Sequence, residues 1–169
     1  MSDLNAVLSD ARSAVADLGA AAEATGSSWL TPRAPGKWSP SQIVEHVARA
    51  FDGSAKELAG VPSDFPKFPS FVRPLVRALF FDRVLKKGAM PKAKTNKAMN
   101  PQAGAPTANE GRARLEEAFA RFEQACLAVE NPRVVSGIFG SVSIEDYVRF
   151  QQIHTRHHLA QMGVASIIR

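Results

Sequence analysis

The chain has 169 residues, of which 45% are hydrophobic and 22% are charged, and its formal net charge is +5 at pH 7. This composition is typical of a globular protein and excludes a disordered chain. The length predicts one domain over residues 1–169 that buries a core without disulfides or a structural metal.

Lysines gather in the loop region 86–106, at Lys86, Lys87, Lys92, Lys94 and Lys97. A nucleic-acid-binding surface is one interpretation, and a solvated loop is the other. Few aromatic residues lie between the lysines, which favours solvated charge, so we expect no nucleic-acid partner.

The N-terminal residues lack the basic and apolar blocks of a signal peptide. No apolar run approaches the roughly 18 residues that a membrane span needs. A cytoplasmic protein without a membrane partner is therefore the expectation. Cys126 is the single cysteine, so an intramolecular disulfide is excluded. Its spacing from Phe119, Phe122 and Val129 predicts a core residue rather than a nucleophile.

The first half of the chain predicts two long helices. Apolar residues at alternating spacings of four and three predict a helix over residues 3–24. A connector rich in proline and glycine follows. Ser39, Pro40 and Gln42 form a helix start with a capping box, and the helix runs to about Leu58. His46 lies on its inward side, where a histidine is either a hydrogen-bonded core group or a ligand.

The middle of the chain predicts an irregular stretch over residues 60–74, followed by a short helix from Pro74 to about Leu85. The loop 86–106 is either a cover over a functional site or a mobile segment, and the sequence leaves both open. The capping box at Thr107 and Glu110 opens a helix to about Val129. A loop from Ser136 to Gly140 then leads to Ser143, the predicted N-cap of the last helix.

The last helix carries polar residues where its spacing predicts a packed stripe. The stripe consists of Tyr147, Gln151, His154, His158, Gln161, Ala165 and Ile168. Buried imidazoles and amides are costly unless they are hydrogen-bonded or bind a metal. A polar network without metal is one explanation, and a metal centre is the explanation we favour.

Three of the four histidines lie within residues 154–158, and His154 and His158 are one helical turn apart. Two imidazoles on one helical face can chelate a divalent ion, but the site needs a further ligand. His46 is the remaining histidine outside this stretch. We therefore predict an all-α bundle that brings His46 to His154 and His158.

The same residues resemble the DinB/YfiT-like superfamily of metalloenzymes. The resemblance is carried by residues 36–40 leading to Glu45, His46 and Val47, by residues 138–143, and by residues 154–161. It implies a four-helix bundle with long irregular connections, and a metal held by His46, His154 and His158. Zinc and nickel are the metals that it implies, with a low-molecular-weight thiol as a further cofactor in thiol-dependent transferases.

His157 lies about 100° around the helix from His158, so both do not readily face one ion. Together with Tyr147, Gln151 and Gln161, it is a candidate for supporting the ligands or contacting substrate. No carboxylate base is identifiable, and Glu45 points away from His46. We predict a metal-dependent enzyme acting on a small molecule, as a transferase or hydrolase of unassigned reaction. The alternative is a non-catalytic metal- or ligand-binding bundle, dimeric through its outer faces. A purely structural bundle whose histidines bond to glutamines is the third option.

Overall fold

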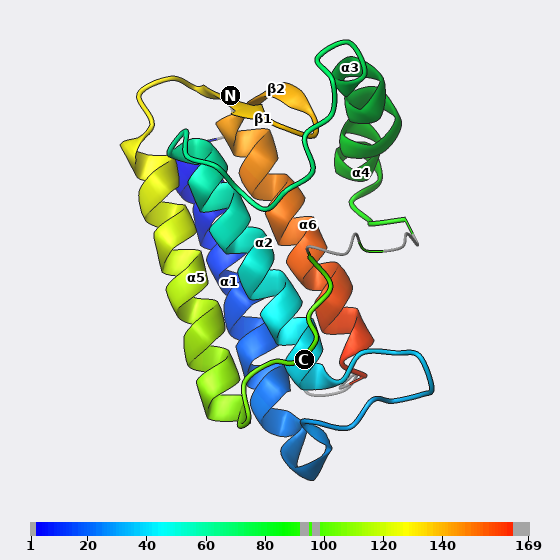
Figure 1. The fold of residues 1–169 in the computed structure, drawn as a ribbon. Coiled ribbons are helices and arrows are strands. Elements are labelled where there is room, and N and C mark those ends of the chain that lie inside the picture. The colour runs from blue at the N-terminus through cyan, green and yellow to red at the C-terminus, as the bar shows by residue number, and fades with distance from the viewer. Residues whose placement is uncertain (1–2, 92–94, 96–98, 164–169) are drawn as a thin grey trace.

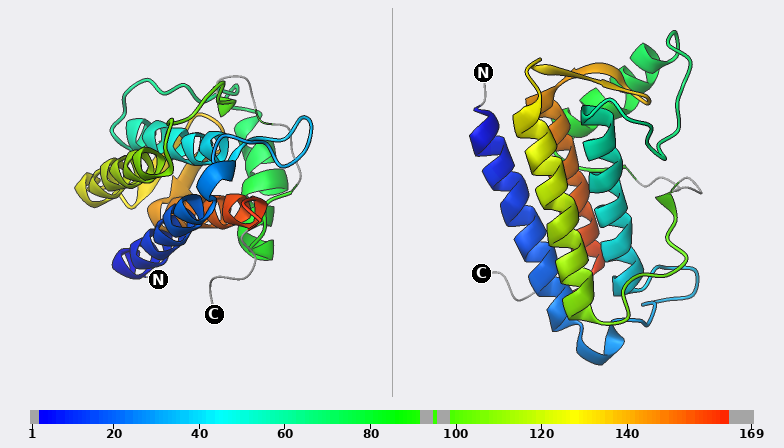
Figure 2. Two further views of the ribbon diagram at one scale, coloured as in Figure 1. Left: turned by 90° about the horizontal axis from the view of Figure 1, so that it is seen from below. Right: turned by 60° about the vertical axis from the view of Figure 1, so that its left-hand side comes forward.

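The computed structural model of the chain describes residues 3–91, 95 and 99–163. Its longest helices lie side by side (Figure 1): α1 (Leu4–Ala24), α2 (Pro40–Leu58), α5 (Ala108–Ala128) and α6 (Ile144–Gln161). The described chain is mostly helical, as the sequence predicts. Helix α2 packs mainly on α5 and helix α1 mainly on α6, and α1 also packs on α5. The view along the helices shows these neighbours in cross-section (Figure 2).

Local hydrogen bonds explain where the long helices begin. Ser39 Oγ accepts from Gln42 N, and Gln42 Oε1 accepts from Ser39 N at 3.0 Å. Thr107 and Glu110 form the same reciprocal box before α5. Ser143 Oγ accepts from the backbone N–H of Asp146 at the start of α6. All three starts are confirmed, since each cap uses residues within three positions of one another.

Large apolar side chains fill the space between the helices. Phe51 of α2 contacts Phe119 and Phe122 of α5, with ring centroids 5.3 Å apart in each pair. Leu8 and Leu18 of α1 are almost fully buried in the same cluster. The packing of these faces, rather than helix propensity alone, stabilises the arrangement.

The segment predicted as a loop over residues 136–140 is instead the turn of a β-hairpin. Strand β1 (Arg133–Ser136) pairs antiparallel with β2 (Gly140–Ser143), from Arg133↔Ser143 to Ser136↔Gly140. Gly140 has φ 72°, a conformation that glycine adopts without steric cost. Strands of four residues leave too short an alternation to stand out from a loop. The hairpin covers the end of the helices where α6 begins (Figure 1).

The predicted short helix is longer and irregular. Helix α3 (Arg73–Val76) continues into a π-helical turn, η2 (Arg77–Phe81), and then into α4 (Asp82–Lys87). The π turn is a feature that apolar spacing does not predict. A short 3₁₀ turn, η1 (Gly26–Ser28), follows α1. Helix α4 packs against α6, so this segment covers one side of the long helices.

In its described portion, the loop 86–106 forms part of a pocket wall. Met90, Pro91, Thr95 and Met99 line the pocket. Lys86 and Lys87 lie in α4. The remaining loop lysines (Lys92, Lys94, Lys97) and two predicted members of the last stripe (Ala165, Ile168) lie outside the described residues. Within residues 3–91 and 99–163, no helix has an apolar stretch long enough to cross a bilayer.

Cys126 lies in the core, as predicted, with 1% of its surface exposed. Burial raises the pKa of its thiol from 9.0 to about 12, because a buried thiolate loses its hydration.

Above pH 9 the unfolded chain therefore binds fewer protons at Cys126 than the native chain, and the free energy of unfolding falls as pH rises. We expect a slope approaching about 1.4 kcal/mol per pH unit from this group. Urea unfolding at pH 8, 9 and 10 measures the slope. Cys126→Ala should flatten it, and an unchanged slope would contradict the assignment.

Candidate metal centre

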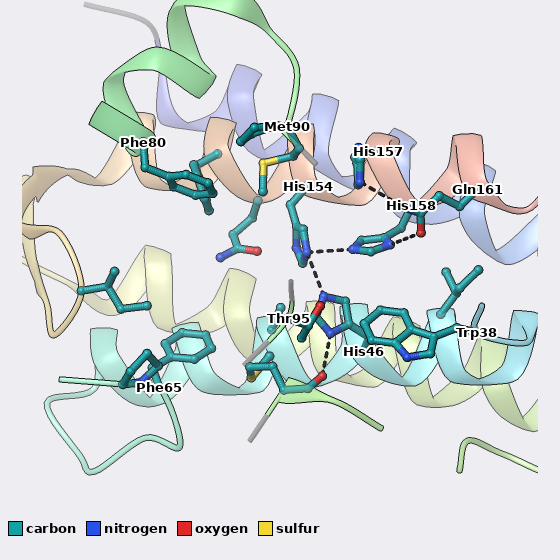
Figure 3. A pocket seen from close by; sticks show the side chains of 18 of the residues that line it. Trp38, His46, Phe65, Phe80, Met90, Thr95, His154, His157, His158 and Gln161 are labelled. Atoms are coloured by element: carbon teal, nitrogen blue, oxygen red, sulfur yellow. Dashed lines mark hydrogen bonds between the residues drawn. The ribbon is translucent and has the colours of Figure 1, made fainter. Parts of the chain in front are cut away.

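Three imidazole nitrogens converge between α2 and α6. His154 Nε2 lies 3.1 Å from His46 Nε2 and 3.1 Å from His158 Nε2. One ring nitrogen of each histidine lies within 4.8 Å of the other two. Tetrahedral zinc with nitrogen ligands at about 2.0–2.1 Å separates those ligands by roughly 3.3 Å. The two spacings to His154 are therefore close to those of a divalent-metal site, and Figure 3 shows the three rings turned toward one another.

Two nearby oxygens determine which nitrogens carry protons. His46 Nδ1 lies 2.7 Å from the backbone oxygen of Met99, and His158 Nδ1 lies 2.9 Å from Gln161 Oε1. Both oxygens only accept hydrogen bonds, so each Nδ1 must donate. In the neutral rings, the lone pairs of His46 and His158 are then on Nε2. Such outer contacts orient metal-binding histidines in general.

The protons at the centre are too few to satisfy the three nitrogens. The Nε2 lone pairs of His46 and His158 both face His154 Nε2. His154 has at most one hydrogen on that nitrogen, so it can donate to one neighbour and leaves the other lone pair without a donor among the described residues. A buried acceptor without a donor is unfavourable. A divalent cation would accept electron density from all three nitrogens, so the donor set fits a metal.

Burial keeps these imidazoles neutral. The pKa of His158 falls to about 3, chiefly because burial disfavours the charged ring, with a further contribution from the neighbouring His46. The pKa of His154 falls well below 6.5, and that of His46 is also lowered, in both cases mainly by burial. At neutral pH the nitrogens therefore offer lone pairs without first losing a proton, as metal binding requires.

The backbone oxygen of Met99 is held in place by hydrogen bonds from the start of α2 to residues 101–105, which follow Met99 in the chain. Ser41 Oγ donates to Ala105 O at 2.8 Å, and Gln42 Nε2 donates to Pro101 O at 3.2 Å. Gly104 permits this close approach, because a Cβ there would lie 2.2 Å from Ser41 O. The start of α2 thus positions both His46 and the group that orients its ring.

The three histidines line a pocket of about 1090 Å³ between α2, α6 and the α3–η2 segment. Trp38 lies beside the centre, with its ring 4.8 Å from that of His46. Phe65 and Phe80 lie toward the opposite end of the pocket (Figure 3). Phe139 and Phe150 also line it, with rings 5.3 Å apart. The centre therefore opens on a cavity lined by several aromatic side chains, which suits a small molecule.

The other predicted site residues also reach the pocket. Gln161 bridges two histidines, since its Oε1 accepts from His158 and its Nε2 donates to His157 Nε2 at 3.0 Å. His157 itself is half-buried and lies outside the convergent trio. Gln151 and Tyr147 are buried nearer the start of α6, one and two turns before His154 respectively. Glu45 is turned away from the pocket and pairs with Arg49 at 2.8 Å.

Sequence reasoning missed Glu57, which anchors the polar residues of α6. Its Oε2 accepts from the Tyr147 hydroxyl at 2.6 Å, and its Oε1 accepts from the backbone N–H of Gly137 at 2.8 Å. Glu57 follows His46 by eleven residues, close to three helical turns, so both lie on one face of α2. That spacing was the available signal. Both carboxylate oxygens are engaged, and no carboxylate lines the pocket within the described residues.

The fold and the convergent histidines together define a mostly helical protein with a candidate three-histidine metal centre. A family model described as the DinB superfamily matches residues 7–162. The chain therefore belongs to the DinB superfamily. Comparisons with curated proteins and with solved structures gave no match.

Proposed function

We propose that the chain is a DinB-like four-helix-bundle domain that binds one divalent metal ion through His46, His154 and His158. The observation that carries this proposal is the convergence of three neutral imidazole nitrogens with too few protons to satisfy them. Zinc and nickel both suit imidazole ligands. Three protein ligands leave a coordination position open, which is typical of catalytic rather than structural sites.

We further propose that the protein is a metal-dependent enzyme acting on a small molecule in the aromatic pocket. When bound, the cation would supply Lewis-acid chemistry and lower the pKa of a thiol or water that it coordinates. The chain supplies the orientation: Met99 and Gln161 hold two of the rings, and the Trp38 ring packs beside that of His46. Thiol-dependent transfer suits the site better than hydrolysis, because the described residues that line the pocket include no carboxylate that could act as a base.

A non-catalytic metal- or ligand-binding protein is the second candidate, and the same lack of a base in the described pocket favours it. Activity separates the two. Untagged protein loaded with zinc or nickel is assayed for transfer of low-molecular-weight thiols to electrophiles and for ester and amide hydrolysis. We expect metal-dependent turnover that His154→Ala loses. Stoichiometric metal without turnover across these assays would favour the binding protein. Absence of metal binding would refute the enzyme and the metal-binding protein, and would leave only a ligand-binding bundle.

A further inference from the structure

The pocket carries a second polar feature beyond the histidines. A chain of hydrogen bonds runs between α2 and α6 through Glu57, Tyr147, Ser54 and Gln151. Tyr147 Oη lies 2.6 Å from Glu57 Oε2 and 3.2 Å from Ser54 Oγ. Ser54 Oγ lies 2.9 Å from Gln151 Nε2. Ser54, Tyr147 and Gln151 are each at least 96% buried, so the chain is shielded from solvent.

The direction of this chain follows from counting its protons. The Glu57 carboxylate accepts, so the single Tyr147 hydroxyl proton points to it. Tyr147 Oη can then only accept from Ser54, which uses the single Ser54 proton. Ser54 Oγ must therefore accept from Gln151, and the amide NH₂ of Gln151 faces Ser54. The opposite orientation of the amide would leave the Tyr147 and Ser54 oxygens in contact with no proton between them.

This direction leaves Gln151 Oε1 at the free end of the chain. The oxygen is buried and accepts no hydrogen bond from the described residues. Gln151 lines the pocket one turn before His154, and Phe80, Phe139 and Phe150 line the same cavity. Phe80 and Phe139 are stacked, with ring centroids 6.2 Å apart and planes 8° from parallel. A buried acceptor without a donor, on a residue that lines the same pocket as these rings, is unfavourable until a donor reaches it.

We propose that this end of the pocket is a recognition site for a ligand that carries an aromatic group with an N–H or O–H donor. The aromatic group packs against the phenylalanines, and the donor binds Gln151 Oε1. Discrimination arises because a ligand of the same shape without the donor leaves the buried oxygen unpaired. The inference rests on the proposed function in assigning this pocket to the substrate, and it names the class of that substrate.

Indole and benzofuran are matched probes, since they share size and shape and differ by an N–H donor against an ether oxygen. Titration of ¹⁵N-labelled protein by NMR gives the Kd of each probe, with and without zinc. We expect indole to bind about tenfold more tightly, the effect of one neutral hydrogen bond. In Gln151→Met the two probes should bind within about twofold of each other. Gln152→Met changes the adjacent glutamine, which does not line the pocket, and should keep the preference.

Equal binding of the two probes, binding of neither, or a preference that survives Gln151→Met would overturn the inference. A preference that disappears on adding zinc would also overturn it, because the indole N–H would then have been bound to histidine lone pairs. If Gln151→Met does not fold, Tyr147→Phe decides. Loss of the Tyr147 hydroxyl frees the Ser54 proton to point at Gln151, so the side-chain amide of Gln151 can flip by 180°. The ratio of the benzofuran Kd to the indole Kd should then fall toward one.

The test of the recognition site can fail or succeed independently of the test of the metal centre. Neutral indole is not a metal ligand, so its preference over benzofuran does not require a bound ion. A protein that binds no zinc or nickel but discriminates the probes through Gln151 refutes the metal centre and retains the recognition site. A protein that binds metal but binds indole and benzofuran equally well retains the metal centre and refutes the recognition site.

Discussion

Replacing His46, His154 or His158 by alanine is expected to abolish stoichiometric binding of zinc or nickel, while His157→Ala largely preserves it. Loss of a contact that merely orients a ligand costs about 10–100-fold in metal affinity, so removal of a ligand should cost more than about 100-fold. His154 is central, because its Nε2 lies 3.1 Å from both other Nε2 atoms. Elemental analysis of protein purified without a His tag, with equilibrium titration of each variant, measures the effect.

His157→Ala is the matched control, since it removes an imidazole from the same helix. His157 accepts a hydrogen bond from Gln161, which in turn accepts from His158. Its removal should therefore weaken binding by less than about tenfold and keep one equivalent of metal. Equal loss of metal from His157→Ala would make the assignment of ligands wrong.

Metal binding should also stabilise the fold by several kcal/mol. The ligands come from α2 and α6, which are separated by a long stretch of chain, so the site forms only in the native protein. At free zinc of 1,000 times Kd, binding to the native state alone adds about 4.1 kcal/mol to the free energy of unfolding. For a protein of this size, we expect a rise in Tm of about 8–16 °C.

Thermal unfolding of the metal-free protein, with and without zinc, measures this gain, and a chelator should reverse it. His154→Ala should show no rise at the same zinc concentration. Affinity of the unfolded chain for zinc, through its histidines and Cys126, would lower the gain but not change its sign. An equal rise in the parent and in His154→Ala would mean that zinc stabilises the protein at another site.

The helices were predictable because their signals are local. Ser39 and Gln42 cap each other across three residues, and the start of α2 follows from them. The pair His154 and His158 is likewise local, since four residues make one helical turn. His46 could be assigned to the pair by elimination, as the fourth histidine of the chain and on an inward helical face. The hairpin and the π turn were missed, because neither has a distinctive pattern in a short stretch.

Two supporting contacts of the site were not predictable, because each joins distant parts of the chain. Met99 reaches His46 across 53 positions, and Tyr147 reaches Glu57 across 90. The sequence places Met99 in a loop and Glu57 at the end of a helix, and neither position implies its partner. Their roles depend on how the loop after α4 crosses α2, and on how closely α2 approaches α6.

The sequence by itself therefore determined the long helices, the polar stripe on the last one and which three histidines converge. Periodicity and capping are interactions between near neighbours, and these can be read from spacing. Only the tertiary structure decided which ring nitrogens face one another and that the side-chain oxygen of Gln151 accepts no hydrogen bond from the described residues. Those outcomes depend on packing between helices far apart in the chain and on counting the protons of groups that this packing brings together.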